Sequence, residues 1–243
     1  MPNAFFISPE NVNGNSFSLD KRESHHAFHV FRLGPGDVIS LLNGKGLGYK
    51  AIIERIEGGI VHGRIEELID QMGENSIEII IAPALLKRER FEGLIEKATE
   101  LGVKEIHPLV ADHCTKRTVN IERCKKIIIA SAKQCQRSYF PVIKEPNTMV
   151  KWLNKPREQC FAGVIGAKSR LKKFNYNKNL PIYILIGPEG DFSVKELDLL
   201  KELGVKLFSL GNRKLRAETA AQTTLSILNA VSYTHLRAHE TET

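Results

Sequence analysis

The sequence has few cysteines and no long apolar run. Its cysteines, Cys114, Cys124, Cys135 and Cys160, form no CxxC pair, so neither a zinc ribbon nor a dense disulfide framework is expected. No apolar run approaches the length of a membrane span, and the first residues lack the basic start of a secretory signal. We therefore expect a soluble, cytoplasmic protein with reduced thiols and no membrane association.

Basic residues outnumber acidic ones. The chain has 35 lysines and arginines against 28 aspartates and glutamates, which gives a formal net charge of +7. This excess favours a polyanionic partner such as a nucleic acid. With 243 residues, of which 42% are hydrophobic, the chain is long enough for one large domain or for a small and a medium-sized one.

The strongest signal lies in two segments near the carboxyl terminus. They are Leu185-Ile-Gly-Pro-Glu-Gly-Asp-Phe-Ser193 and Leu210-Gly-Asn-Arg-Lys-Leu-Arg-Ala-Glu-Thr-Ala-Ala221. In each segment an apolar strand runs into glycine and a helix is expected to follow. Glycine allows the backbone to approach a ligand closely or to take a positive φ. Two such corners at the carboxyl ends of neighbouring strands would enclose a ligand-binding crevice.

Neither segment is a phosphate-binding fingerprint. Gly187-Pro-Glu-Gly190 lacks the GxGxxG spacing, and the chain contains no GxxxxGK[ST]. The carboxylates of Glu189 and Asp191 would also repel a phosphate. A cationic or zwitterionic ligand fits this crevice better.

The two segments resemble the last two cofactor-loop motifs of the SPOUT class of RNA methyltransferases. Within that class the chain is similar to the bacterial family that methylates N3 of a uridine in small-subunit (16S) ribosomal RNA. Three further segments share this likeness: His25-His-Ala-Phe-His-Val-Phe-Arg-Leu-Gly-Pro-Gly-Asp37, Glu96-Lys-Ala-Thr-Glu-Leu-Gly-Val103 and Ala132-Lys-Gln-Cys-Gln-Arg137. The resemblance implies S-adenosyl-L-methionine as the cofactor, no metal, and a homodimer with the carboxyl-terminal helices at its interface.

The resemblance also implies which residues act. The cofactor-binding residues would be Gly187, Glu189, Gly190, Leu210, Gly211, Leu215, Arg216, Thr219 and Ala220. Arg216 and Arg137 would be catalytic, because a guanidinium near the target base can stabilise negative charge on a carbonyl. Capping of the final helix is the plainer alternative for Arg216, and a cation at a helix end is the plainer one for Arg137. For Arg213 the sequence supports a structural role and a functional role equally.

Residues 1–70 read as a small β-barrel. Short strands are expected at residues 38–42, 49–56 and 60–65, separated by glycine-containing turns. Ser24 is expected to cap a short helix that carries Phe28 and Phe31. The resemblance identifies this region as a PUA-like RNA-binding domain.

Residues 75–231 alternate between strand-like and helix-like segments. This alternation predicts an α/β domain with a parallel sheet covered on both faces. The resemblance implies that it is a SPOUT methyltransferase domain with a carboxyl-terminal trefoil knot. Residues 232–243 lack apolar periodicity and depart from how the family ends, so we expect them to be a non-native tail.

The expected function is methylation of N3 of a uridine in small-subunit ribosomal RNA, within the assembled or assembling subunit. Two alternatives stay open: a SPOUT methyltransferase that acts on transfer RNA, and a non-catalytic RNA-binding factor for ribosome assembly. Basic clusters at residues 87–90, 125–126 and 168–173 are either RNA contacts or ordinary solvated faces.

Overall fold

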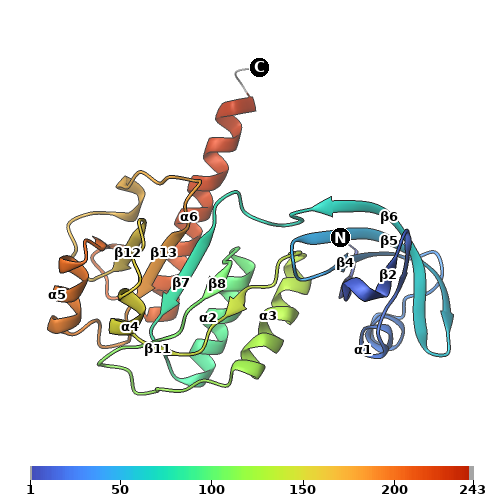
Figure 1. Ribbon diagram of the computed structural model, residues 1–243, viewed down its shortest axis with the longest axis horizontal. Helices are drawn as coiled ribbons and strands as arrows, with labels where there is room; N and C mark the ends of the chain where they lie inside the picture. The colour runs from blue at the N-terminus through green and yellow to red at the C-terminus, as the bar shows by residue number, and fades with distance from the viewer. Residues whose placement is uncertain (1, 241–243) are drawn as a thin grey trace. The chain divides into compact units, whose positions relative to one another are not determined.

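The computed structural model describes the backbone of residues 2–240 and the side chains of residues 2–230. The chain divides into two compact units, coloured by residue number in Figure 1. The first unit comprises the residues up to 74 together with residues 129–140, and the second comprises residues 75–128 and those from 141 onward. None of the helices in the described part of the chain combines the length and the apolar character needed to cross a membrane.

The first unit is built on a six-stranded sheet in the order β1-β4-β5-β6-β3-β2. β1 and β4 pair in parallel and the other neighbours are antiparallel. Alternate side chains of the long strands face a core that includes Phe5, Ile39 and Ile53. The strands are β1 (Ala4–Phe6), β2 (Val12–Asn13), β3 (Ser16–Ser18), β4 (Val38–Leu42), β5 (Leu47–Glu57) and β6 (Ile60–Asp70).

The short helix of the first unit begins earlier than expected. α1 (Lys21–His25) is capped by Asp20, whose Oδ1 accepts a hydrogen bond from the Glu23 amide at 2.7 Å. The expectation that Ser24 is the cap is therefore wrong: Ser24 is buried inside the helix, and its hydroxyl donates to the carbonyl of Leu19. A π-helical turn, η2 (His26–Val30), continues α1, and a 3-10 turn, η1 (Pro9–Asn11), precedes β2.

Residues 129–140 belong to the first unit although they are distant from it in the sequence. Lys133 forms an ion pair with the buried Glu23 at 2.6 Å, and the Ser138 hydroxyl donates to the Gly46 carbonyl at 2.8 Å. These residues form the second half of α3 (Ile121–Cys135) and the segment after it, so the division falls within this helix.

The second unit contains a six-stranded, all-parallel sheet in the order β10-β8-β7-β13-β12-β14. This confirms the predicted parallel α/β architecture, while the knot stays a prediction. A separate two-stranded sheet pairs β9 (Leu109–Val110) with β11 (Asn147–Thr148). The strands of the main sheet are β7 (Ile79–Pro83), β8 (Glu105–Ile106), β10 (Val142–Ile143), β12 (Cys160–Gly163), β13 (Ile182–Ile186) and β14 (Lys206–Phe208).

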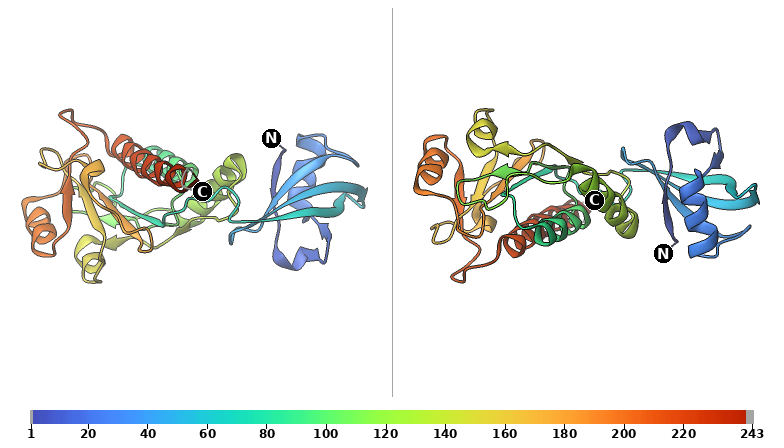
Figure 2. Two further views of the ribbon diagram at one scale, coloured as in Figure 1. Left: turned by 90° about the horizontal axis from the view of Figure 1, so that it is seen from above. Right: turned by 90° about the horizontal axis from the view of Figure 1, so that it is seen from below.

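Helices cover both faces of this sheet. α2 (Arg88–Glu100) and α6 (Ala217–Glu240) run side by side on one face, and α4 (Met149–Leu153) lies on the other (Figure 2). α4 and α5 (Val194–Glu202) share a core with alternate strand residues such as Ala162 and Leu185. A 3-10 turn, η3 (Leu171–Lys173), precedes β13. Both faces of the central strands are buried, as expected for a parallel sheet.

Candidate active site

Three strands bring their carboxyl ends together at one edge of the second unit's sheet. β13 ends at Ile186, β12 at Gly163 and β14 at Phe208, and the three run in parallel. β12 lies between the other two, so the expectation that the two glycine-containing corners follow neighbouring strands is wrong. The segment after β12 therefore contributes a third wall, which sequence reasoning missed.

A narrow pocket of about 60 Å³ lies at these strand ends. Four predicted cofactor-binding residues line it, and so does Arg213, whose role the sequence left undecided. Gly187, Glu189, Gly190, Arg216 and Thr219 are not among the residues that line this pocket. The lining residues are Gly163, Val164, Ile165, Phe208, Ser209, Leu210, Gly211, Arg213, Leu215 and Ala220.

Gly211 occupies a backbone conformation that favours glycine. Its φ is +148°, and its amide and carbonyl both bond to the Ser209 hydroxyl, at 3.2 and 3.0 Å. A Cβ at this position would lie 3.5 Å from the guanidinium of Arg170, which is an ordinary contact. The backbone angle, rather than crowding by neighbouring atoms, therefore explains the glycine here.

Gly187 and Gly190 have a different explanation. A Cβ on Gly187 would lie 3.2 Å from the ring of Phe192, and a Cβ on Gly190 would lie 3.2 Å from the Cβ of His113. His113 Nδ1 also lies 2.9 Å from the carbonyl oxygen of Asp191, a residue with a φ of +62°. Close packing within the second unit thus shapes the Gly-Pro-Glu-Gly corner.

Arg90 on α2 connects the two predicted cofactor loops, and sequence reasoning missed this role. Its guanidinium forms an ion pair with Glu189 and lies 3.8 Å from Glu218 Oε1 at the start of α6. Glu218 Oε2 is buried and has no hydrogen-bond partner in the described part of the chain. The second unit therefore holds an acidic pair, bridged by one arginine, beside the Gly-Pro-Glu-Gly corner.

Arg216 and Thr219 lie at the exposed beginning of α6. The Arg216 carbonyl accepts a hydrogen bond from the Ala220 amide at 2.8 Å, so its backbone serves as the start of the helix. This capping role involves only the main chain. The exposed guanidinium of Arg216 is therefore accessible to a ligand.

Arg137 lies in the first unit, and its surroundings give it a structural explanation. Its Nη2 and Nε lie 2.7 and 3.1 Å from the two carboxylate oxygens of Glu74, and the two side chains are 2% and 1% exposed. Glu74 Oε1 also accepts from the Tyr139 amide at 3.0 Å. A bidentate, buried pair of this kind fixes the guanidinium in one geometry.

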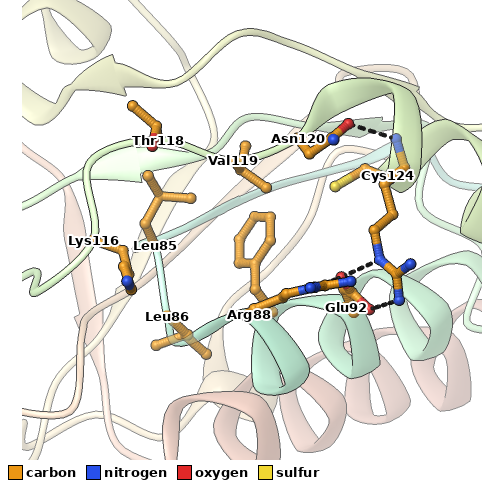
Figure 3. Close-up of a pocket in the computed structure, with 11 residues that line it drawn as sticks. Leu85, Leu86, Arg88, Glu92, Lys116, Thr118, Val119, Asn120 and Cys124 are labelled. Atoms are coloured by element: carbon orange, nitrogen blue, oxygen red, sulfur yellow. Dashed lines mark hydrogen bonds and ion pairs between the residues drawn. The ribbon is translucent and has the colours of Figure 1, made fainter.

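A second and larger pocket lies in the second unit, between the start of α2 and the segment that leads into α3 (Figure 3). Its volume is about 330 Å³, and it combines apolar side chains with three cations. Glu92 stands among these cations, and hydrogen bonds from Arg123 and Arg88 lower its pKa to about 2. The sequence signalled only part of this pocket, as a basic cluster at residues 87–90.

Two family models match the chain. A model described as RNA methyltransferase domain matches residues 73–229, and one described as RNA methyltransferase PUA domain matches residues 19–66. Among curated proteins, the ribosomal RNA small subunit methyltransferase E of Rickettsia conorii is 33% identical over 86% of this chain and 88% of its own length. The protein of the same name from Bacillus subtilis is 28% identical over 90% of each chain.

Solved structures agree with this match. A methyltransferase of Legionella pneumophila, in complex with the bound cofactor SAM, superposes with a TM-score of 0.83 at 28% identity, over 95% of this chain and 98% of its own. A ribosomal RNA small subunit methyltransferase E from Neisseria gonorrhoeae shares the fold, with a TM-score of 0.86 at 23% identity over 95% of this chain and 98% of its own.

Proposed function

The chain belongs to the RNA methyltransferase family, with an amino-terminal PUA domain, and from this we propose that it methylates N3 of a uridine in small-subunit ribosomal RNA. The observation that carries the proposal is the match, over most of the chain, to proteins named ribosomal RNA small subunit methyltransferase E. The crevice at the ends of β13, β12 and β14 is where an open α/β sheet binds its ligand.

S-adenosylmethionine would bind in this crevice. The pocket of about 60 Å³ would hold only one part of such a ligand, with Gly163 and Gly211 in its lining and apolar contacts from Leu210, Leu215 and Ile165. Three residues of the neighbouring corner and three at the start of α6 complete the proposed binding set: Gly187, Glu189, Gly190, Arg216, Thr219 and Ala220. When bound, S-adenosylmethionine supplies a methyl group that is already activated for transfer by its sulfonium.

The residues of this chain would then orient the uridine and manage its charge. N3 of uridine must lose its proton before or during attack on the methyl carbon, and negative charge spreads onto the flanking carbonyl oxygens. The guanidinium of Arg216, exposed at the start of α6, would stabilise this charge. Because Arg137 is buried in its pair with Glu74, we assign the catalytic role to Arg216 and a structural role to Arg137.

The first unit would capture the RNA, because the family model that matches residues 19–66 is described as an RNA methyltransferase PUA domain. We further propose that the enzyme acts in the cytoplasm as a homodimer joined through α6. The same proposal includes two domains, at residues 1–70 and 75–231, and a non-native tail at residues 232–243. Of this tail, residues 241–243 lie outside the described residues.

The test uses the full chain, S-adenosylmethionine with a labelled methyl group, and small ribosomal subunits or free 16S RNA lacking this modification. We expect the label in RNA, at one uridine, as 3-methyluridine by mass-spectrometric mapping. A methyl group on a ribose hydroxyl, or transfer to transfer RNA instead, would replace this proposal with another SPOUT activity. Cofactor binding without any transfer to RNA would refute the enzymatic function.

A further inference from the structure

The larger pocket, which we term the α2–α3 pocket, is distinct from the crevice that would hold the cofactor. It is lined by the side chains of Leu85, Leu86, Arg88, Phe91, Glu92, Lys116, Thr118, Val119, Asn120, Arg123 and Cys124, all of the second unit. None of these residues lines the narrow pocket at Gly163 and Gly211. Its volume of about 330 Å³ is within the range typical of small-ligand sites.

The floor of the α2–α3 pocket is apolar. Leu85 and Leu86, which follow β7, are 2% and 4% exposed, and Phe91 and Cys124 are 1% exposed. Burial raises the pKa of the Cys124 thiol to about 11, so at neutral pH this thiol is uncharged and adds to the apolar surface. Such a floor suits the flat, weakly polar face of a nucleobase.

The rim of the pocket is cationic. Arg88 and Arg123 both bond to Glu92, with Nε of Arg88 2.9 Å from Oε1 and Nη2 of Arg123 2.8 Å from Oε2. Lys116 makes no ion pair among the described residues and is exposed. Three cations against one carboxylate leave two positive charges uncompensated, and Glu92 holds the two guanidinium groups in place.

The start of α2 connects this pocket to the crevice. Arg88 faces the α2–α3 pocket, whereas Arg90 contacts Glu189 and Glu218 beside the proposed cofactor loops. Residues two apart on an α-helix point to nearly opposite sides. The α2–α3 pocket and the corner at Glu189 therefore lie on opposite sides of the start of α2, about one helix diameter apart, which is on the order of 10 Å.

We propose that the α2–α3 pocket binds one nucleotide of the RNA strand, adjacent to the uridine that is methylated. The base would lie against the apolar floor, and its phosphate would contact Lys116, Arg88 and Arg123 on the rim. This inference rests on the proposed function, because it requires the target uridine to reach the crevice. Single-stranded RNA is bound in this way when splayed bases enter apolar pockets and cations follow the backbone.

The test compares full-length variants by their KM for substrate RNA, their affinity for RNA at several salt concentrations, and their affinity for S-adenosylmethionine by calorimetry. Lys116→Ala and Arg88→Ala remove rim charges, and Val119→Trp fills the pocket without changing charge. Lys201→Ala is the matched control, since Lys201 is an exposed cation of the same unit that pairs with Asp198 and does not line the pocket.

We expect each rim variant to raise the KM for RNA about tenfold and to reduce the salt dependence of RNA binding by about one released counterion. Val119→Trp should raise the KM without changing the salt dependence. Cofactor affinity should match the wild-type protein, and the melting temperature should fall by no more than the loss of one exposed ion pair explains. Melting curves exclude a variant that raises KM only because it is partly unfolded.

Two results would overturn the inference. One is a KM for the rim variants equal to that of Lys201→Ala. The other is a wild-type KM for the folded Val119→Trp protein. That result would mean that the rim cations attract RNA without any base entering the pocket. Both results presuppose a wild-type enzyme that methylates RNA; absence of that activity would instead refute the proposed function.

Discussion

The ion pair between Arg137 and Glu74 offers a sharp test, because the same arginine can be interpreted as catalytic or as structural. The two side chains are 2% and 1% exposed and are joined by contacts of 2.7 and 3.1 Å. Removing one partner of a buried pair leaves a charge without compensation and typically costs about 3–5 kcal/mol. Glu74→Gln, which keeps the shape of the side chain, should therefore lower the free energy of unfolding by about this amount.

The expected loss is a large part of the total stability of a domain, which is roughly 5–15 kcal/mol. In a chain of this size it corresponds to a melting temperature lowered by about 6–20 °C. The assay is urea unfolding at pH 7, followed by circular dichroism, of the wild type, Glu74→Gln, Arg137→Met and the double variant. Because two apolar or neutral groups can replace a buried pair at little cost, the double variant should be more stable than Glu74→Gln alone.

The opposite pattern would refute this reasoning. If Arg137 contacts the target base, Arg137→Met should abolish methylation while leaving the unfolding free energy within about 1 kcal/mol of wild type, which is the size of an ordinary surface change. Activity measured below the unfolding transition distinguishes the two outcomes. In our interpretation the stability falls first, and the activity of the remaining folded fraction stays close to that of the wild type.

Three further predictions concern the second unit. Gly211→Val should abolish S-adenosylmethionine binding in calorimetry with only a modest fall in melting temperature, because a β-branched residue resists a φ of +148°; unchanged affinity would exclude Gly211 from the site. Arg216→Ala should slow single-turnover methylation roughly 100- to 1000-fold, with cofactor affinity retained and partial rescue at high pH; parallel loss of affinity and rate would make Arg216 a binding residue. The pKa of Glu92 is lowered from 4.5 to about 2, so its ion pairs stabilise the fold above pH 4.5 and lose this effect as the pH falls toward 2. Since its arginine partners are largely exposed, Glu92→Gln should cost on the order of 1 kcal/mol at pH 7 and much less near pH 2 in urea unfolding; an equal cost at both pH values would contradict the ionic explanation.

The strands and helices near the crevice could be predicted because local signals there agree with the fold. Ser193 and Glu196 form the capping box at the start of α5, just after the first glycine-containing corner. At α1 the same kind of signal was available, since Glu23 follows Asp20 by three residues, yet the sequence reasoning placed the cap at Ser24. The error is local: the Ser24 hydroxyl donates to the Leu19 carbonyl and accepts from the Val61 amide of β6, and it caps no amide of the helix.

The order of the strands and the grouping of distant segments could not be predicted in this way. Periodicity identifies β12, β13 and β14 as strands, but it carries no information on which two are neighbours. The segment at residues 129–140 joins the first unit through Lys133 and Arg137, two cations that in the sequence resemble any basic residues on a helix. Long-range ion pairs leave no periodic trace in the sequence.

These limits explain why the sequence predicts only some of the residues that line the narrow pocket. One continuous motif contains four of the lining residues, so their grouping could be predicted from the sequence: Leu210, Gly211, Leu215 and Ala220. Gly163 and Ile165 reach the same pocket only because β12 inserts between β13 and β14. A crevice built at the ends of parallel strands always recruits residues from segments that are separated in the chain by whole helices. Its composition therefore follows from the strand order, which is a property of the folded chain and not of any one motif.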